Sequence, residues 1–388
     1  MEEHIIYHLF LIFAGAAILA TLALYLRQAI IIAYILLGLL LGPSMLNLVP
    51  DPELIARIAD IGIIFLLFLL GLNLHPQKLL KLFHRTLLIT VFSSLLFACL
   101  GFGFAWLAGY HGMDILMIGV AVVFSSTIIG LKLLPTSVLH HQHTGELIIS
   151  ILLLQDILAI FALLFIRAHE FGGTPGPRAL LLIASLPALV LAVKFVQEKL
   201  INRLLMRFDT IQEYIFLLAI GWCLGVAELA SALGLSAEMG AFIAGVSLAS
   251  SPISTFIAES LKPLRDFFLV LFFFALGAGI NLQQITPVIV PALLLAGLML
   301  VIKPFVFKWL LHKTGENILR SQEIGLRLGQ TSEFSLLISV LALSQGLIST
   351  QAAYLIQATT VLTFVVSPYL IVLRYPTPIA VSDKLRRD

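Results

Sequence analysis

Long apolar segments, separated by short polar stretches, run along the whole chain. Each segment has about 18 to 25 residues, the length that an α-helix needs to cross the roughly 30 Å hydrocarbon core of a bilayer. The pattern predicts an all-α polytopic membrane protein with about thirteen transmembrane helices. The expected spans are residues 5–25, 28–47, 54–73, 86–108, 113–134, 146–167, 178–198, 211–230, 233–251, 262–281, 285–310, 322–345 and 350–373.

The composition supports a membrane protein and excludes several other classes. Hydrophobic residues make up 60% of the 388 residues and charged residues only 11%, which is less than half of the roughly 25% charged residues of soluble domains. No Walker A motif, GxGxxG fingerprint or catalytic triad is present. We therefore expect neither an enzyme nor a cofactor, and the net charge of +2 gives no reason to expect a nucleic-acid partner.

The positions of Lys and Arg predict the orientation in the membrane, because cytoplasmic loops are enriched in them. We expect the N-terminus outside and the C-terminus in the cytoplasm. The acidic N-terminal head lacks the basic region of a signal peptide, so the first segment is expected to be a retained span. With this orientation the basic residues of the cytoplasmic side are Arg27, Lys78, Lys81, Arg85, Lys199, Arg203, Arg207, Lys262, Arg265, Lys313, Arg320, Arg374, Lys384, Arg386 and Arg387.

Two pairs of similar segments indicate an internal repeat. YILLGLLLGPS (34–44) is similar to AFIAGVSLASSP (241–252), and FLLFLLGLNLHPQ (65–77) is similar to VLFFFALGAGINLQQ (270–284). Both pairs lie in the same order, about 207 residues apart. The alternative is a chance likeness between glycine-rich apolar helices.

The repeat predicts a single transmembrane domain over residues 1–388. Repeat one would cover about 5–167, a linker helix about 178–198, and repeat two about 211–373. Because an odd number of crossings separates the two copies, they would point in opposite directions. Inverted repeats are typical of secondary transporters, whose substrate site lies near the membrane centre.

A carboxylate lies in the middle of the apolar segment ISILLLQDILAIFALLF (149–165). Asp156, next to Gln155, is about ten residues from the start of its span. A charge there costs a few kcal/mol at least, and such residues usually face a cavity or a partner. Asp156 is therefore a candidate ion or proton site, with Gln155 supplying a carbonyl oxygen or orienting the site. The alternative is a neutral side chain in a helix–helix hydrogen bond.

Polar residues also interrupt two spans at corresponding places in the two repeats. Such interruptions predict broken helices whose free carbonyl oxygens bind a monovalent cation. The alternatives are ordinary helix packing for the hydroxyls and a structural pairing of Glu333 with Arg327. The interrupting residues are Ser125, Ser126 and Thr127 in the fifth span, and Arg327, Gln330, Thr331, Ser332 and Glu333 in the twelfth.

Two further features carry charge. Lys303, before Pro304, either extends to the inner membrane surface or lies next to the candidate site and neutralises charge there. The sequence HHQH (140–143) is expected in a cytoplasmic loop, as a solvated segment or a mild pH sensor.

In combination these motifs resemble the Kef-type branch of the monovalent cation:proton antiporters. The resemblance covers essentially the whole chain. It rests on FSSTIIGLKLL (124–134), LLLQDILAI (152–160), GLSAEMGAFIAGVSLASSP (234–252), LFFFALGAGINL (271–282) and LGQTSEFSLLI (328–338).

The resemblance implies two inverted six-helix repeats with crossed broken helices, and a central aspartate at which cation and proton compete. It implies electroneutral K⁺/H⁺ exchange by alternating access, because a single carboxylate is present and the Gln-Asp pair favours potassium. A Na⁺/H⁺ antiporter, a gated K⁺ channel and an organic-anion carrier are the alternatives. The implied cation and proton site is Asp156 with Gln155, Ser125, Ser126 and Thr127, and the implied supporting charges are Lys303, Glu333 and Arg327.

The resemblance also implies a homodimer in a bacterial-type inner membrane, with a role in pH homeostasis. A separate regulatory subunit is a further candidate partner. Two departures matter: Asn73 replaces an acid frequent in Kef members, and the segment PISTFIAESLKPLRD (252–266) matches only partly. No cytosolic nucleotide-binding domain is expected, so the chain would be naturally short or a shortened version. Gating by glutathione or nucleotides is therefore not carried over.

Overall fold

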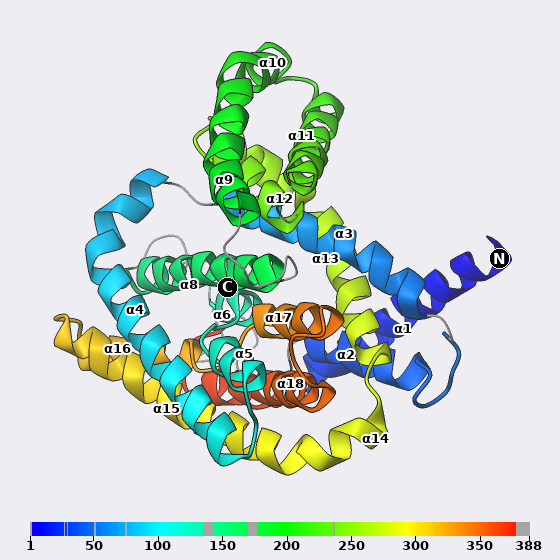
Figure 1. The fold of residues 1–388 in the computed structure, drawn as a ribbon, viewed down its shortest axis with the longest axis vertical. Coiled ribbons are helices and arrows are strands. Elements are labelled where there is room, and N and C mark those ends of the chain that lie inside the picture. The colour runs from blue at the N-terminus through cyan, green and yellow to red at the C-terminus, as the bar shows by residue number, and fades with distance from the viewer. Residues whose placement is uncertain are drawn as a thin grey trace. The chain divides into compact units, whose positions relative to one another are not determined.

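A computed structural model describes residues 2–26, 28, 30–49, 52–73, 76–134, 143–169, 177–233, 235 and 237–377. The regular elements of this described part are helices (Figure 1). Their bounds are α1 (Glu2–Tyr25), α2 (Ile30–Leu41), α3 (Pro52–Asn73), α4 (Pro76–Leu107), α5 (Met113–Ala121), α6 (Thr127–Lys132), α8 (His143–His169), α9 (Pro177–Val196), the π-helix η1 (Gln197–Ile201), α10 (Asn202–Arg207), α11 (Gln212–Ala232), α12 (Ala237–Leu248), α13 (Ser254–Ala278), α14 (Leu282–Ile285), the 3-10 helix η2 (Thr286–Val288), α15 (Ile289–Lys313), α16 (Ile318–Arg327), α17 (Glu333–Ser344) and α18 (Thr350–Val372).

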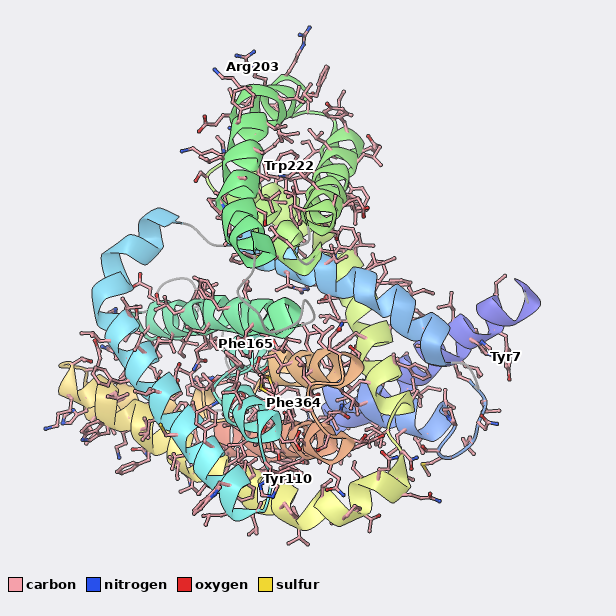
Figure 2. All side chains as sticks on the ribbon, viewed as in Figure 1. Tyr7, Tyr110, Phe165, Arg203, Trp222 and Phe364 are labelled. Carbon is pink, nitrogen blue, oxygen red and sulfur yellow. The ribbon has the colours of Figure 1, made fainter. Side chains whose placement is uncertain are left out.

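Length and apolar composition make many of these helices suitable for a membrane. Six helices of the described residues are long and apolar enough to cross one, and α2, α17 and part of α12 are shorter apolar helices. Apolar side chains are also exposed at helical spacing along α15, at Val290, Leu294, Val301 and Phe305. Exposed apolar side chains are distributed over other helices as well, for example Phe165 of α8 (Figure 2). Such faces would be unfavourable in water and are suited to contact with lipid.

The chain divides into two compact units, and each combines segments from both halves of the sequence. The first unit contains residues 1–12, 38–80 and 167–279, and the second contains residues 13–37, 81–166 and 280–388.

In the first unit, α12 and α13 both pack against α3, and α11 packs against α12. The core is built from apolar residues such as Phe68, Leu72 and Cys223, which are buried together. Trp222 of α11 adds a polar link, because its Nε1 donates to the Ala244 carbonyl oxygen (3.3 Å) and to the Ser247 hydroxyl (3.2 Å) of α12 (Figure 2).

Two glycines of the first unit allow helices to approach each other's backbone. A Cβ atom on Gly38 would collide with the carbonyl oxygen of Phe274, and a Cβ atom on Gly245 would collide with that of Phe68. Gly38 and Gly245 are the two glycines that align in the sequence repeat, and Phe68 and Phe274 lie at matching places in the other pair. The two contacts are therefore reciprocal between the halves of the chain.

The second unit holds every residue predicted for the cation and proton site. Here α15 packs against α16 and α18, and α17 packs against α18 and α5. Phe364, on the middle of α18, is completely buried in this unit (Figure 2). The prediction of an all-α membrane protein is confirmed at the level of secondary structure.

Helix boundaries depart from the expected spans in both directions. The segments expected at 28–47 and 233–251 form the shorter helices α2 (Ile30–Leu41) and α12 (Ala237–Leu248), whereas other helices extend past their apolar part. The segment expected at 86–108 begins as α4 at Pro76, and the segment expected at 262–281 begins as α13 at Ser254. Polar residues at these ends do not stop a helix, because helix propensity is not limited to apolar residues. A hydropathy pattern therefore locates the apolar part of a helix, which is suited to the membrane, and does not locate the ends of the helix.

Candidate functional site

The first feature of the site is the interruption between α5 and α6. Helix α5 ends at Ala121, α6 begins at Thr127, and the sequence between them is VVFSS. Valine is restricted in a helix by its branched Cβ, and serine hydroxyls compete for backbone partners. Ser126 shows this directly, because its Oγ accepts a hydrogen bond from the Ile129 N–H (3.1 Å) in the first turn of α6.

The second interruption separates α16, which ends at Arg327, from α17, which begins at Glu333. Ser332 is the N-cap of α17, and its hydroxyl accepts from the Phe334 N–H (3.2 Å). The Ser335 hydroxyl accepts from the Ser332 N–H (3.3 Å), which completes a capping box. The hydroxyl residues of this segment thus start a new helix directly after the break.

The two interruptions contact each other inside the second unit. The Ser125 hydroxyl donates to the Leu328 carbonyl oxygen (2.9 Å), and the Gln330 Nε2 donates to that of Ser126 (3.4 Å). The Ser335 hydroxyl also donates to the Ala121 carbonyl oxygen (2.6 Å). Side chains of each broken segment therefore donate to carbonyl oxygens of the other, including those of Leu328 and Ala121 at the ends of helices. The Ser126 carbonyl oxygen also accepts from the Gly130 N–H (3.1 Å).

Lys303 of α15 holds both interruptions together. Its Nζ donates to the carbonyl oxygens of Val123 (3.3 Å), Phe124 (2.7 Å) and Gln330 (3.1 Å). An ammonium group has three N–H donors, so each is used. Lys303 is fully buried, and its Nζ lies 5.3 Å from the ring centre of Phe97. The alternative of a side chain that extends to the membrane surface is excluded, and Lys303 is a buried neighbour of both interruptions.

Asp156 lies on α8, next to the first interruption. Its side chain is 1% exposed, and the Thr127 hydroxyl lies 3.4 Å from Oδ1 and 3.3 Å from Oδ2. Since that hydroxyl has one proton, it donates to one of the two oxygens at a time. These long hydrogen bonds leave the carboxylate with much of its capacity to bind a proton or a cation.

Gln155 and the serines of the first interruption are used differently. The Gln155 Oε1 accepts from the Ser125 N–H (3.1 Å), and its Nε2 donates to the Val123 carbonyl oxygen (3.2 Å). Of the two roles expected for Gln155, this arrangement fits the one that orients the site. Ser125 and Ser126 likewise bond to backbone groups, whereas Thr127 alone of these hydroxyls bonds to Asp156 in the described structure.

Glu333 and Arg327 are both buried, but the arginine has a different acidic partner from the expected one. Its Nε and Nη2 donate to Glu323 Oε1 at 3.0 Å and 2.8 Å, and further N–H groups donate to the carbonyl oxygens of Leu133 and Pro376. Residues four apart share one face of α16, whereas the interruption separates Arg327 from Glu333. The Glu333 carboxyl interacts electrostatically with that of Asp156.

Two polar clusters contain residues that the sequence did not indicate as site residues. The first is a row of hydroxyls on α18, where Thr363 and Ser367 contact the second interruption. Its signal in the sequence is the spacing of Thr359, Thr363 and Ser367 by four residues, which is one helix face. The second cluster surrounds Glu316 at the start of α16.

His143 connects the start of α8 to the start of α16. Its Nε2 lies 3.0 Å from Glu316 Oε1, and its Nδ1 lies 3.4 Å from Glu146 Oε2. Arg320 adds an ion pair to Glu316 at 3.1 Å. Both ring nitrogens of His143 therefore face a carboxylate, one on α8 and one just before the start of α16. The rest of the HHQH segment, residues 140–142, lies outside the described residues.

Glu316 gives a pH-dependent contribution to stability. Partial burial alone would raise its pKa, but hydrogen bonds from His143 and Arg320 outweigh burial and lower the pKa below the usual value of 4.5. A carboxyl group with a lowered pKa stabilises the fold above its unfolded pKa and loses that effect as the pH falls through its folded pKa. Glu316→Gln should therefore cost on the order of 1 kcal/mol at neutral pH, as partly exposed ion pairs do.

The measurement is the difference in Tm between Glu316→Gln and the wild type in detergent, from neutral pH down to below pH ~4. The difference should shrink toward zero in acid, and Glu146→Gln, at a more exposed position, should change Tm less. A Tm difference that stays constant across the whole range would show that these hydrogen bonds do not stabilise the charged form of Glu316.

Comparison with known proteins defines the class to which this arrangement belongs. A family model described as "Sodium/hydrogen exchanger, transmembrane" matches residues 11–372. The chain belongs to this sodium/hydrogen exchanger family, whose members are transporters and not enzymes.

Particular relatives agree with the resemblance predicted from the motifs. The chain is 29% identical over 382 residues to the glutathione-regulated potassium-efflux system protein KefC of Klebsiella pneumoniae, and the match covers 96% of this chain and 61% of KefC. It is 30% identical over 356 residues to K(+) efflux antiporter 4 of Arabidopsis thaliana (88% and 59% covered), and 28% identical over 357 residues to the iron transporter MagA of Paramagnetospirillum magneticum (89% and 80% covered). The predicted resemblance to Kef-type antiporters is confirmed, and the chain spans about three-fifths of the length of the KefC relatives.

The fold is also similar to a solved structure. The sodium proton antiporter MjNhaP1 from Methanocaldococcus jannaschii superposes with a TM-score of 0.71, covering 94% of this chain and 95% of that one at 20% identity. At this identity the similarity establishes the fold alone. The chain has the all-helical fold of that antiporter.

Proposed function

We propose that this chain is a secondary active monovalent cation:proton antiporter that exchanges K⁺ for H⁺ at Asp156. The observation that carries the proposal is the position of Asp156. A buried carboxylate lies beside two helix breaks that contact each other, with a hydroxyl oxygen 3.3 Å away. Membership of the sodium/hydrogen exchanger family and the names of the potassium-efflux relatives support it.

Charge at the site accounts for the coupling of the two ions. A proton on Asp156 makes the carboxyl neutral, and a bound monovalent cation compensates its charge equally well. Empty and ionised, the site would carry an uncompensated negative charge, which is costly within the membrane. Only the two loaded forms then change their exposure from one side of the membrane to the other, and exchange of one cation for one proton is electroneutral.

The other groups have roles that follow from their contacts. The Thr127 oxygen and backbone carbonyl oxygens of the interruptions are the proposed neutral ligands, since such oxygens replace the hydration shell of K⁺. Gln155, Ser125 and Ser126 hold the first interruption in shape through backbone hydrogen bonds. Lys303 holds the crossing, and Glu333 influences the charge of Asp156 from close by.

The finer architecture is part of the same proposal. We propose thirteen transmembrane helices in two inverted six-helix repeats, with α5–α6 and α16–α17 as crossed broken helices. The reciprocal contacts of Gly38 with Phe274 and of Gly245 with Phe68 support the repeat. The units support it as well, because the second unit combines residues 81–166 with residues 280–388. An N-terminus outside, a cytoplasmic C-terminus, a bacterial inner membrane and a homodimer remain proposals from the sequence.

Transport is tested with purified protein in liposomes that contain a trapped pH dye. An imposed K⁺ gradient should drive proton movement in the opposite direction, and a Na⁺ gradient should drive it less. Valinomycin fixes the voltage only in the Na⁺ experiment, because it carries K⁺ itself. A Na⁺ gradient that drives faster proton movement would establish the Na⁺/H⁺ alternative. K⁺ flux without proton movement would establish a channel and refute antiport.

A further inference from the structure

Helix α18 presents a row of buried hydroxyls that the proposed exchange does not yet use. Thr359, Thr360, Thr363 and Ser367 are each 1% exposed or less. Hydroxyls in an apolar helix commonly bond to a carbonyl one turn earlier in the same helix, as Thr360 does with Ile356 (2.8 Å). Thr363 and Ser367 also reach the second interruption, which lies on another segment of the chain.

Thr363 supplies an acceptor to the broken segment. Its Oγ1 accepts from the Thr331 N–H (3.1 Å) and lies 2.7 Å from the Thr331 hydroxyl. The Thr363 hydroxyl donates its single proton to the Thr360 carbonyl oxygen (2.9 Å). The Thr331 hydroxyl must then be the donor of the pair. The two contacts with Thr363 fix both the backbone and the side chain of Thr331. The lone pairs of the Thr331 hydroxyl oxygen remain available to bind a cation.

Ser367 fixes the orientation of the Gln330 amide. Its hydroxyl donates to Gln330 Oε1 (2.9 Å), an atom that can only accept. Gln330 Nε2 is thereby turned toward the carbonyl oxygens of Arg327 (2.9 Å) and Ser126 (3.4 Å). Gln330 also gives its backbone carbonyl oxygen to Lys303. Ser367 on α18 thus fixes the orientation in which Gln330 connects the two interruptions.

We propose that Thr363 and Ser367 are positioning residues that set the affinity of the site for the transported cation. The inference rests on the proposed exchange at Asp156. A proton binds to the Asp156 carboxylate alone, whereas a cation needs several oxygens of the interruptions at the correct places. Displacement of Gln330 and Thr331 therefore weakens cation binding and leaves the proton step largely intact.

The variants are Thr363→Val and Ser367→Ala, which remove each hydroxyl with little change in volume. Thr363→Ser and Ser367→Thr keep a hydroxyl and should restore the wild-type behaviour. Thr360→Val is the matched control, because Thr360 is equally buried on the same helix and its hydroxyl bonds within that helix. Asp156→Asn is measured in parallel.

The measurement is proton movement in the dye-filled liposomes against K⁺ concentration, at several pH values. Loss of either hydroxyl should raise the KM for K⁺ about five- to tenfold, the effect of one lost buried hydrogen bond, with the maximal rate within about twofold. Since a weaker cation competes less well with protons, half-maximal exchange at fixed K⁺ should move to a higher pH. A residue that acts only on stability would lower the amount of active protein and leave KM and the pH profile unchanged.

Three results would overturn the inference. They are an unchanged KM in both hydroxyl-free variants, an equal rise of KM in Thr360→Val, and failure of Ser367→Ala to fold, which would assign the residue to stability. If Thr363→Val does not fold, the result of Ser367→Ala tests the inference alone. Loss of the Ser367 hydroxyl leaves no backbone N–H without an acceptor, whereas loss of the Thr363 hydroxyl does. Unimpaired exchange by Asp156→Asn is a separate outcome, which would refute the proposed function itself.

Discussion

Replacement of Asp156 by asparagine is expected to abolish exchange. Asn has nearly the same shape as Asp and can keep the contact with Thr127, but it can neither ionise nor release a proton. Cation-driven proton movement should fall to the level of protein-free liposomes, a loss of at least about a hundredfold. The protein should remain folded, because Asp156 forms no ion pair with the described residues and its neutralisation leaves no buried charge without its partner. Proton movement in dye-filled liposomes and Tm in detergent measure the two effects.

The matched control is Glu228→Gln, which changes an exposed carboxylate on the apolar helix α11. It should transport like the wild type. Thr127→Val should lie between the two, with exchange reduced a few-fold, because it removes one long hydrogen bond. If Asp156→Asn exchanged ions at the wild-type rate, the carboxylate would be structural and another residue would have to carry the proton.

Replacement of Lys303 by methionine is expected to have the largest effect on stability. Methionine keeps most of the volume but donates nothing to the three carbonyl oxygens that the ammonium holds. The Val123 carbonyl oxygen keeps the Gln155 Nε2 as a donor, but those of Phe124 and Gln330 lose the lysine. Buried polar groups left unsatisfied cost about 1–3 kcal/mol each, so a loss of about 2–6 kcal/mol is expected. In a chain of this size the Tm should fall by roughly 3–7 °C, and exchange should fall with it because the two interruptions are no longer held together.

Lys308→Met is the control for Lys303, since it lies on the same helix and is partly exposed. Its Tm should stay within about 2 °C of the wild type, as for surface substitutions. A Lys303→Met protein with the Tm and exchange rate of the wild type would mean that the interruptions keep their geometry without the lysine.

The sequence predicted the parts of this fold that depend on a one-dimensional pattern. Apolar length located the helices, and the expected span 350–373 differs from α18 (Thr350–Val372) by a single residue. Clusters of hydroxyl and charged residues indicated where α5–α6 and α16–α17 break. Such positions can be recognised in the sequence because polar groups are costly inside an apolar helix and usually face a partner or a cavity.

The partners across the chain could not be predicted in the same way. Lys303 contacts Val123 and Phe124, about 180 residues earlier, and its ligands are backbone carbonyls that leave no mark in the sequence. The sequence allows Arg327 to pair with Glu333, yet it pairs with Glu323. Arg327 and Glu323 lie four residues apart on one face of α16, whereas the helix ends before Glu333. The contacts of Thr363 and Ser367 also depend on how α18 packs beside the break.

The most direct test of the central claim is whether cation binding displaces a proton from Asp156. Purified protein in weakly buffered detergent solution would receive K⁺, and the released protons would be measured with a pH dye. At a pH below the pKa of the empty site the account predicts release of about one proton per bound cation, falling to about half a proton at that pKa, and no release from Asp156→Asn. Cation binding without proton release, or equal release from Asp156→Asn, would contradict competition of the two ions for this carboxylate.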